Sequence, residues 1–337
     1  MKFLVVGLGS MGKRRIRNLM YLNHTDIIGC DTSQERRSEV ESKYSIKTFS
    51  NLDEAFAQKP DAVIISTPPE KHYDIAVKTA EQGFPFFMEA NVIPDGFEKV
   101  VLTCSKKDVF YAPSCTMRFN PSLRKVNELV KNNSIGKVLA FVYHVGQYLP
   151  DWHPYEDYRT FYVSKKETGA CREIVPFELN WLSWTFGDIT NLAAMKRKVS
   201  KLESDIDDIY ATILEFDSGI VGNLVVDVLS RVPYRTLKII GEEGVITWEW
   251  IEKKVRVYHT STKSWDEHVE PPGIKIEGYV AEENQYIDEM SSFVSGLHDP
   301  SNYSHNPQSE QRILDILKKI EESSEQGMHT TVKQKIK

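Results

Sequence analysis

The sequence predicts an α/β Rossmann domain at the N-terminus, followed by an α+β domain with a large, mostly antiparallel open sheet. Two patterns in the 337 residues predict this architecture. Short apolar runs alternate with amphipathic stretches in the first third of the chain, which favours parallel strands joined by helical crossovers. Later apolar runs follow one another closely, which favours antiparallel pairing. We assign residues 1–119 to a Rossmann dinucleotide-binding domain, 120–305 to an α+β domain for substrate and oligomerisation, and 306–325 to a C-terminal helix before a flexible tail.

The expected strands of the first domain are continuously hydrophobic rather than alternating. That pattern fits strands buried on both faces of a doubly wound sheet. The strands are expected at 3–9, 26–31, 61–67, 84–90 and 109–115, and the helices between them at 12–22, 36–44, 71–82 and 97–107.

In the second domain, helices are expected at 121–132 and near 173–186, and strands become frequent after residue 190. The alternating stretch 135–149 is followed by expected strands at 191–199, 208–216, 219–229, 234–241, 244–250 and 253–259. Helices would cover one face of this sheet. We expect apolar side chains such as Leu224, Val226 and Trp248 to make the other face a subunit interface, giving a homodimer or homotetramer.

Composition excludes several classes of function. With 41% hydrophobic and 27% charged residues, the chain has the mix of a globular protein with a core. A net charge of -6 argues against nucleic-acid or anionic-membrane partners, although Lys13, Arg14, Arg15 and Arg17 form a local basic patch. No apolar run is long enough for a membrane span, and the N-terminus lacks the pattern of a secretion signal. We therefore expect a cytoplasmic protein.

The spacing of cysteine and histidine gives no support to a metal site. The four cysteines have no CxxC or CxxH spacing, which favours free thiols in a reducing compartment. The nine histidines show no HxxxH pairing, so no metal is expected.

A glycine motif follows the first expected strand and opens the first helix. It reads Gly7-Leu8-Gly9-Ser10-Met11-Gly12, with Asp31 at the end of the next strand. Gly7 permits a tight turn, Gly9 lets a pyrophosphate approach the backbone, and Gly12 lets the helix pack on the strand. The helix N-terminus then favours phosphate binding. The motif predicts a dinucleotide site.

The residue at position 31 predicts which dinucleotide is bound. The Asp31 carboxylate would accept hydrogen bonds from the ribose hydroxyls and repel a 2′-phosphate, so NAD is favoured over NADP. Arg36 and Arg37 weaken this preference, since either could turn back towards a phosphate.

Beyond the glycine motif, the chain resembles the glucose–fructose oxidoreductase / inositol dehydrogenase / MocA family. The resemblance rests on Ser66-Thr67-Pro68-Pro69-Glu70-Lys71-His72, on Met117-Arg118-Phe119-Asn120-Pro121 and on Ile135-Gly136-Lys137. It implies an NAD(P)-dependent oxidoreductase that acts on a hydroxyl or keto group of a sugar, sugar phosphate or nucleotide sugar. It also implies that Ser66, Thr67, Pro68, His72, Glu89, Ala90 and Arg118 join the glycine motif and Asp31 at the cofactor. The stretch 149–159 resembles a branch found in bacterial surface-sugar pathways.

The chain departs from the family at the residues that move protons. The family's Glu-Lys-Pro reads Glu89-Ala90-Asn91 here, so the lysine is missing. In the helix expected near 173–186, Ile174 stands in place of the family's aspartate and Phe177 in place of its histidine.

Another base must therefore take the hydroxyl proton, if the chain is a dehydrogenase. We expect Glu173 to be that base and Arg172 to bind a carboxylate or phosphate of the substrate, with His153, Asp157 and Tyr158 as further catalytic candidates. Each residue also has a structural interpretation. Arg172 and Glu173 could be a charge pair at a helix start, His72 a cap, and Arg118 a pin at the domain junction.

Two alternatives to a dehydrogenase remain open from the sequence. The chain could bind a dinucleotide or sugar without net turnover. It could also be an epimerase or lyase that uses tightly bound NAD transiently.

Overall fold

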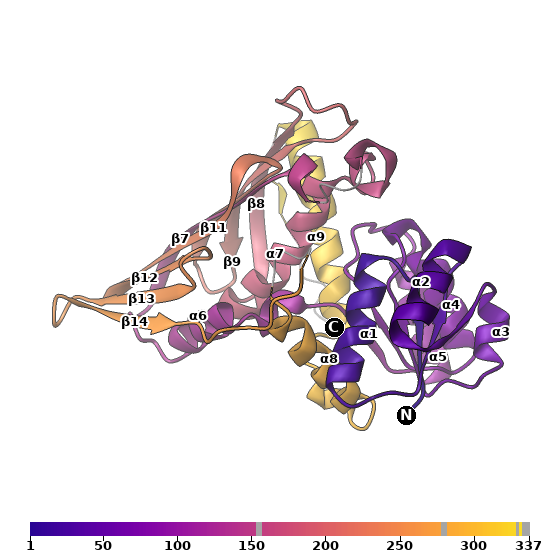
Figure 1. Cartoon of the computed structure of the whole chain (residues 1–337). Helices are drawn as coiled ribbons and strands as arrows, with labels where there is room; N and C mark the ends of the chain where they lie inside the picture. Colours follow the sequence, from indigo (N-terminus) through magenta and orange to yellow (C-terminus); the bar gives the residue numbers. More distant parts are fainter. Residues whose placement is uncertain (153–156, 278–281, 328–329, 332–337) are drawn as a thin grey trace. The chain divides into compact units, whose positions relative to one another are not determined.

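The computed structural model describes residues 1–152, 157–277, 282–327 and 330–331 (Figure 1). Met1–Thr116 and Gly273–Arg312 form one compact unit, and Met117–Pro272 and Ile313–Lys337 form the other. We call them the Rossmann unit and the sheet unit. Residues 273–305, which the sequence analysis placed in the second domain, belong to the Rossmann unit. Most of the tail expected after residue 325 lies outside the described residues.

The Rossmann unit is built on a parallel sheet, six-stranded within the described residues, with the order β3-β2-β1-β4-β5-β6. Its strands are β1 (Phe3–Val6), β2 (Ile27–Cys30), β3 (Lys47–Phe49), β4 (Ala62–Ile65), β5 (Phe86–Met88) and β6 (Tyr111–Pro113). The strand order reverses between β1 and β4, which is where a doubly wound sheet binds its ligand. The predicted fold class is confirmed, although β3 was not predicted.

Helices complete the Rossmann unit. They are α1 (Ser10–Tyr21), α2 (Gln34–Tyr44), α3 (Leu52–Phe56), α4 (His72–Glu81), α5 (Phe97–Lys107) and α8 (Asn284–Gly296), with 3₁₀ turns η1 (Pro69–Lys71), η2 (Thr116–Phe119, at the boundary of the two units) and η6 (Pro300–Asn302). The late helix α8, which was not predicted, packs against α1. The beginning of the chain is thus covered by a segment from near its end.

The sheet unit holds a nine-stranded sheet within the described residues, with the order β14-β13-β12-β11-β7-β10-β9-β8-β15. Its strands are β7 (Val138–Tyr148), β8 (Ile189–Arg197), β9 (Ile209–Phe216), β10 (Val221–Asp227), β11 (Leu229–Gly241), β12 (Gly244–Glu249), β13 (Lys254–His259), β14 (Ser264–Val269) and β15 (Thr330–Thr331). Among these strands only β7 and β10 pair in parallel. The predicted, mostly antiparallel sheet is confirmed.

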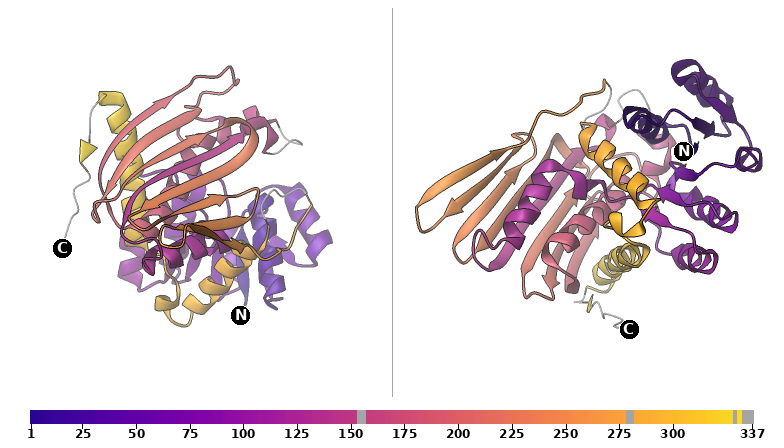
Figure 2. Two further views of the ribbon diagram at one scale, coloured as in Figure 1. Left: turned by 90° about the vertical axis from the view of Figure 1, so that its left-hand side faces the viewer. Right: turned by 90° about the horizontal axis from the view of Figure 1, so that it is seen from below.

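Helices lie along one face of this sheet, as the two views of Figure 2 show. They are α6 (Pro121–Lys131), α7 (Ala170–Phe186) and α9 (Pro307–Gln326), and three short 3₁₀ turns, η3 (Leu149–Asp151), η4 (Tyr158–Thr160) and η5 (Tyr162–Ser164), join β7 to α7. Between the helices and the sheet lies one continuous hydrophobic core.

The expectation for the open face of the sheet was wrong in its residues. Leu224, Val226 and Trp248 are buried in the core on the helix side. The apolar side chains exposed on the opposite face lie on β7, β8, β9, β10 and β11, where they alternate with core positions of those strands. They are Val142, Met195, Ile213, Val221 and Ile240.

The turn between β1 and α1 is the tightest packed part of the Rossmann unit. Gly7 has φ +89°, and a Cβ there would lie 2.6 Å from the Ser66 carbonyl oxygen. A Cβ on Gly12 would lie 1.8 Å from the Gly7 carbonyl oxygen. A Cβ on Gly9 would meet no atom within 4 Å. Glycine is therefore required at 7 and 12 by the fold, whereas the fold leaves space at 9.

This contrast predicts different effects for two alanine substitutions. Gly12→Ala should destabilise the protein by about 3 kcal/mol or more, because backbone atoms must move to admit the methyl group. Gly9→Ala should change stability by about 1 kcal/mol or less, the scale of an N-cap change. Urea unfolding of the two variants measures this. Equal stability losses would contradict the packing described for the turn.

Candidate functional site

The N-terminus of α1 has the features of a phosphate site. Gly9 is its N-cap, no side chain caps the helix, and its first turn has no acidic residue. The positive end of the helix dipole is therefore not countered by an acidic residue of that turn. The open space next to Gly9 lies at the same helix end. Backbone and dipole together favour an anion here.

Asp31, at the end of β2, is tied to the glycine turn. Its carboxylate accepts a hydrogen bond from the backbone N–H of Leu8 at 2.8 Å and one from Ser33 N–H at 2.8 Å. The residue is only 9% exposed. Two backbone donors thus fix the carboxylate beside the turn, which is the position that ribose hydroxyl recognition requires.

The two arginines after Asp31 have different partners. Arg37 donates to the backbone carbonyls of Asp31 at 2.7 Å and Thr32 at 3.0 Å. Arg36 Nη1 lies 3.7 Å from the Asp31 carboxylate, and half of its side chain is exposed. Because Arg37 is occupied by the backbone, Arg36 is the arginine better placed to reach a ligand phosphate.

The segment after β4 carries the motif that resembles the family's nicotinamide turn. His72 is buried, and its Nε2 lies 2.7 Å from the Thr67 carbonyl oxygen. Burial lowers the pKa of His72, which favours the neutral ring. Thr67 Oγ1 is a buried hydroxyl oxygen without a hydrogen-bond partner among the described residues. The histidine therefore acts as a cap that shapes the turn, and the threonine hydroxyl can bond to a ligand.

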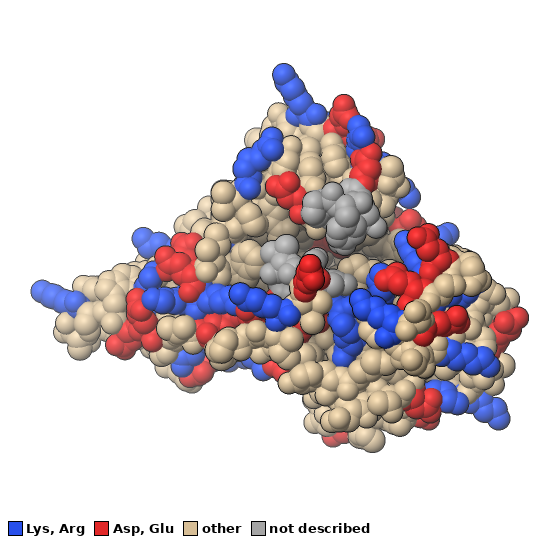
Figure 3. Space-filling view, in the orientation of Figure 1, with Lys and Arg blue, Asp and Glu red and all other residues tan. Residues whose placement is uncertain are grey.

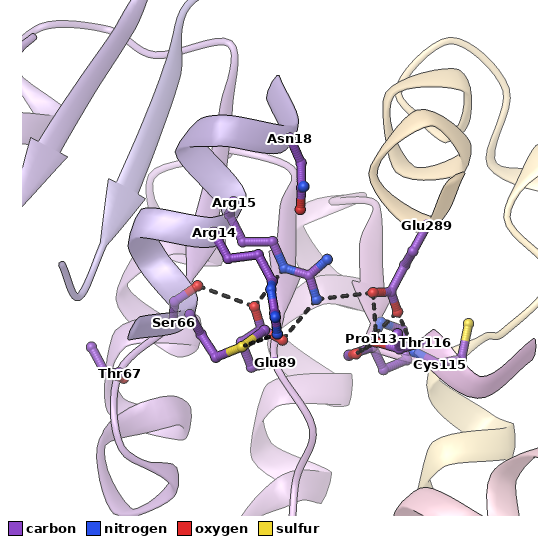
Figure 4. Close-up of polar contacts among 12 residues, drawn as sticks. Arg14, Arg15, Asn18, Ser66, Thr67, Glu89, Pro113, Cys115, Thr116 and Glu289 are labelled. Carbon is purple, nitrogen blue, oxygen red and sulfur yellow. Dashed lines mark hydrogen bonds and ion pairs between the residues drawn. The ribbon is translucent and has the colours of Figure 1, made fainter. Parts of the chain in front are cut away.

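Behind this turn lies a buried ion cluster, which is drawn in Figure 4. Arg15 of α1 is fully buried. Its Nε and Nη2 donate to the two oxygens of Glu89 at 2.6 and 2.8 Å, and Nη2 also lies 2.9 Å from Glu289 of α8. The Ser66 hydroxyl donates to Glu89 at 3.2 Å. One guanidinium thus joins α1, the end of β5 and α8.

The second carboxylate of the cluster binds the segment after β6. Glu289 accepts hydrogen bonds from Cys115 N–H at 2.6 Å, the Ser114 hydroxyl at 3.0 Å and the Thr116 hydroxyl at 2.8 Å. Burial raises the pKa of Glu289, against the lowering effect of Arg15. Burial alone would lower the pKa of Arg15, but the carboxylates of Glu89 and Glu289 outweigh it and raise that pKa.

This cluster corrects the expectation of a basic patch. Arg14 and Arg15 are buried, and Arg14 Nε donates to Glu283 at 3.0 Å. Lys13 pairs with Glu39 at 2.8 Å. Figure 3 shows acidic and basic side chains interspersed over the face that it presents. The basic run was misread because alternate faces of α1 pair with acidic residues distant in sequence.

Asn91, at the position of the family's proline, joins a second buried network. Its amide nitrogen donates to Glu310 at 2.9 Å, and its oxygen lies 3.3 Å from His72 Nδ1. Glu310 in turn bonds to His305 Nε2 at 2.8 Å, and both are buried. Polar contacts with Glu310 and His72 therefore hold Asn91, the residue at the position of the family's proline.

Taken together, the residues of the Rossmann unit fit a dinucleotide. The space beside Gly9, the fixed carboxylate of Asp31 and the hydroxyl of Thr67 lie at the carboxyl ends of β1, β2 and β4. These are adjacent strands that flank the reversal in strand order, the expected ligand edge. Ser10 and Met11 follow β1 and Pro68 follows β4, whereas Ala90 follows β5, the neighbour of β4.

The catalytic candidates lie in the sheet unit. Glu173 is in the first turn of α7 and accepts a hydrogen bond from the Tyr162 hydroxyl at 3.2 Å. Arg172 donates to Glu321 of α9 at 2.5 and 3.1 Å and to the Glu167 carbonyl oxygen at 2.5 Å. The Arg172 guanidinium thus already has a carboxylate partner, which argues against its use for a substrate anion.

The loop candidates have separate surroundings. Asp157 forms an exposed pair with Arg159, in which oxygen and nitrogen approach to 2.6 Å, and the Tyr158 hydroxyl accepts from Glu203 N–H at 3.1 Å. Hydrogen bonds to Arg159 lower the pKa of Asp157 to about 2. His153 lies outside the described residues. Arg118 donates to the Asn180 side chain at 2.6 Å.

The two α7 positions that the sequence analysis aligned with the family's aspartate and histidine are apolar. Ile174 is buried, and Phe177 is partly buried against the core.

No group of three or more His, Cys, Asp or Glu side chains suited to a metal occurs in the part of the chain that the structure describes. Among those residues, no helix has the length and apolarity needed to cross a bilayer.

Sequence reasoning missed Arg15, Glu289 and Glu310. Arg15 lies three residues after Gly12, and helix positions three apart share a face. This spacing could have placed Arg15 on the face of the helix that packs against the strand. Its partners gave no comparable signal, since their contacts join distant segments.

Comparison with known proteins identifies the family. Residues 1–113 match the model of the oxidoreductase family with an NAD-binding Rossmann fold, and residues 123–247 match the GFO/IDH/MocA C-terminal domain. Levoglucosan dehydrogenase of Pseudarthrobacter phenanthrenivorans is 22% identical over 251 residues, which cover 65% of this chain and 64% of that protein. The chain thus spans somewhat less than two thirds of that relative's length.

Solved structures show the same fold. An oxidoreductase from Agrobacterium radiobacter, in complex with NAD+, L-tartaric acid and magnesium, has a TM-score of 0.88 and 15% identity over 98% of both chains. The WlbA dehydrogenase from Bordetella pertussis, in complex with NADH and UDP-GlcNAcA, has a TM-score of 0.79 and 18% identity over 99% of both chains. The family models, the two folds and the dinucleotide site agree, and the chain belongs to the Gfo/Idh/MocA family of oxidoreductases, with an NAD-binding Rossmann domain.

Proposed function

We propose that this protein is an NAD-dependent oxidoreductase that acts on a hydroxyl or keto group of a sugar, a sugar phosphate or a nucleotide sugar. The observation that carries the cofactor preference is the Asp31 carboxylate, held by Leu8 N–H beside the open glycine turn. The sugar class is supported by relatives named for levoglucosan and found with UDP-GlcNAcA.

The bound NAD would accept or donate the hydride, so the chain has to bind it and to move one proton. In this proposal, the α1 N-terminus binds the phosphates and Asp31 the ribose, while Thr67, Pro68, Glu89 and Ala90 lie at the nicotinamide. His72 would shape that turn from behind, through its contact with the Thr67 carbonyl oxygen.

Glu173 is the proposed base for the hydroxyl proton. The residue is partly buried, its Oε2 has no accessible surface, and the Tyr162 hydroxyl donates to its Oε1. A neutral donor such as a phenol hydroxyl orients a carboxylate without the charge of a cationic partner, which suits a general base. His153, Asp157 and Tyr158 remain secondary candidates, and Arg118 a cofactor contact. Arg172 instead holds the start of α7 to α9 through Glu321.

The two alternatives differ from this proposal in product rather than in binding. The apolar side chains at Ala90, Ile174 and Phe177 favour a binding protein without turnover, because the family's proton-transfer groups are absent there. An epimerase or lyase would leave NAD unchanged after each turnover. One assay that follows both cofactor and sugar separates all three.

Incubation with NAD and a panel of sugars, sugar phosphates and nucleotide sugars should produce NADH with one of them. Absorbance at ~340 nm measures the cofactor, and mass spectrometry measures the sugar. A converted sugar without NADH would indicate transient redox. Tight NAD binding with every sugar unchanged would contradict the dehydrogenase proposal for the classes tested.

With the substrate in hand, Glu173→Gln should lower kcat by about 100-fold or more, the contribution of a general base. Glu167→Gln, at an exposed glutamate six residues earlier, is the matched control and should keep full activity. Full activity of Glu173→Gln would remove Glu173 from the mechanism.

We also propose that the protein is a cytoplasmic homodimer or homotetramer that associates through the open face of the sheet unit. That face exposes Met195 (58%) and Ile213 (57%) on the adjacent strands β8 and β9, and Val142 (50%) on β7, which β10 separates from β9. Such an apolar patch favours self-association.

Ile213→Lys should shift the mass measured by light scattering towards that of a monomer, because it places a charge at the centre of the patch. Ile251→Lys, in the turn after β12, is equally exposed but off the sheet face, and should leave the mass unchanged. A monomeric wild-type protein would contradict the proposal.

A further inference from the structure

Arg15 carries an inference about how the cofactor site is held together. It lies on α1, the helix whose N-terminus is the proposed phosphate site, three residues after Gly12. Its side chain does not reach that helix end. It runs instead into the interior of the Rossmann unit, where Figure 4 shows it pointing towards Glu89 and Glu289.

The guanidinium is held through Nε and Nη2, while Nη1 is buried without a hydrogen-bond partner among the described residues. Two parallel hydrogen bonds of 2.6 and 2.8 Å bind it to Glu89, and a contact of 2.9 Å binds it to Glu289. Its central carbon lies 4.5 Å from the centre of the Phe87 ring, on the same strand end as Glu89. A bidentate pair that also stacks on an aromatic ring fixes both the position and the plane of the carboxylate.

Glu89 and Ser66 directly follow β5 and β4, the strand ends assigned above to the nicotinamide half of the site. Glu89 is nearly buried, with 12% of its side chain exposed, and it accepts the Ser66 hydroxyl at 3.2 Å. The position of both residues therefore depends on the charge that faces Glu89 from the interior. Arg15 supplies that charge.

We propose that Arg15 is a positioning residue for the nicotinamide half of the dinucleotide. It holds Glu89, and through Glu89 the Ser66 end of β4, in one arrangement relative to α1, without touching the dinucleotide. This inference rests on the proposed function. It separates the two halves of the site: the adenosine and phosphate half depends on the glycine turn and Asp31, and the nicotinamide half depends in addition on Arg15.

Arg15→Lys tests the proposal, because an ammonium group keeps the charge but cannot form the two parallel bonds. The readout is binding of NAD and of ADP-ribose, which lacks the nicotinamide, measured by calorimetry. We expect NAD affinity to fall about tenfold or more, and ADP-ribose affinity to change by about twofold or less.

Arg14→Lys is the matched control. Arg14 is the adjacent residue, is also buried in an ion pair, with Glu283, and also stacks on an aromatic ring, that of Tyr286, 3.9 Å away. None of these partners lies at the nicotinamide strand ends. Arg14→Lys should therefore change the affinity for both ligands by the same factor, whatever it does to stability.

A double-mutant cycle tests whether Arg15 acts through Glu89. Glu89→Gln should show the same selective loss of NAD affinity, and adding Arg15→Lys to it should cause little further loss. If Arg15→Lys does not fold, Glu289→Gln decides, since it removes the second carboxylate partner of Arg15 and leaves Glu89 itself unchanged. It should lower NAD affinity more than ADP-ribose affinity, and an equal effect on both ligands would overturn the positioning role.

The outcomes separate this inference from the proposed function. Equal loss of NAD and ADP-ribose affinity in the Arg15 and Glu89 variants, or no loss, would overturn the positioning role and leave the dinucleotide site standing. Absence of NAD binding by the wild-type protein would overturn both. Selective loss of NAD affinity, with the Arg14 control unchanged in its ratio, supports both.

Discussion

The approach of α1 to the glycine turn is the constraint on which the rest of the site depends. A Cβ on Gly12 would lie 1.8 Å from the Gly7 carbonyl oxygen and 3.5 Å from Val5 on β1. The helix can therefore take only one position against the strand. That position leaves the backbone at Gly9 open, and it directs Arg15, on the same helix face, into the interior. Phosphate binding and the buried ion cluster are two results of one packing contact.

The interior of the Rossmann unit is held by charges as well as by apolar side chains. Buried charges are costly unless they are paired and hydrogen-bonded. Glu289 meets that condition with donors from Ser114, Cys115 and Thr116 in addition to Arg15. Because these donors follow β6 and Glu89 follows β5, the pairing also sets the spacing of two strand ends. The chain uses an ionic network where a purely apolar core would leave the strand ends less defined.

The proposed acid–base chemistry depends on side chains of the sheet unit. The resemblance aligns Ala90, Ile174 and Phe177 with the family's proton-transfer residues, and Glu173 accepts a hydrogen bond from Tyr162. Membership of the family establishes the fold and the cofactor domain. The base that we propose is a different residue on that scaffold.

Local patterns in the sequence predicted the fold class, the glycine turn and the carboxylate at Asp31, because each depends on neighbours within one βαβ unit. Contacts between distant segments escaped prediction. Arg15 and Glu89 are 74 residues apart, and Ser114 and Glu289 are 175 apart, so the arginines of α1 looked like a surface patch. The strand β3 was missed because it lies at the edge of the sheet and only one of its three residues is buried, so it gives no apolar run. The late helix α8 has neither a side-chain cap nor an acidic residue in its first turn, so its start gives no sequence signal. Leu224, Val226 and Trp248 were assigned to the wrong face because alternation in a strand shows two faces but not which one the helices cover.

Calorimetric titration of the wild-type protein with NAD and with NADP tests the central claim most directly. The account predicts that NAD binds, and that it binds about tenfold or more tightly than NADP, because the Asp31 carboxylate is fixed beside the glycine turn by two backbone donors. Equal or tighter binding of NADP, or no binding of either dinucleotide, would contradict it.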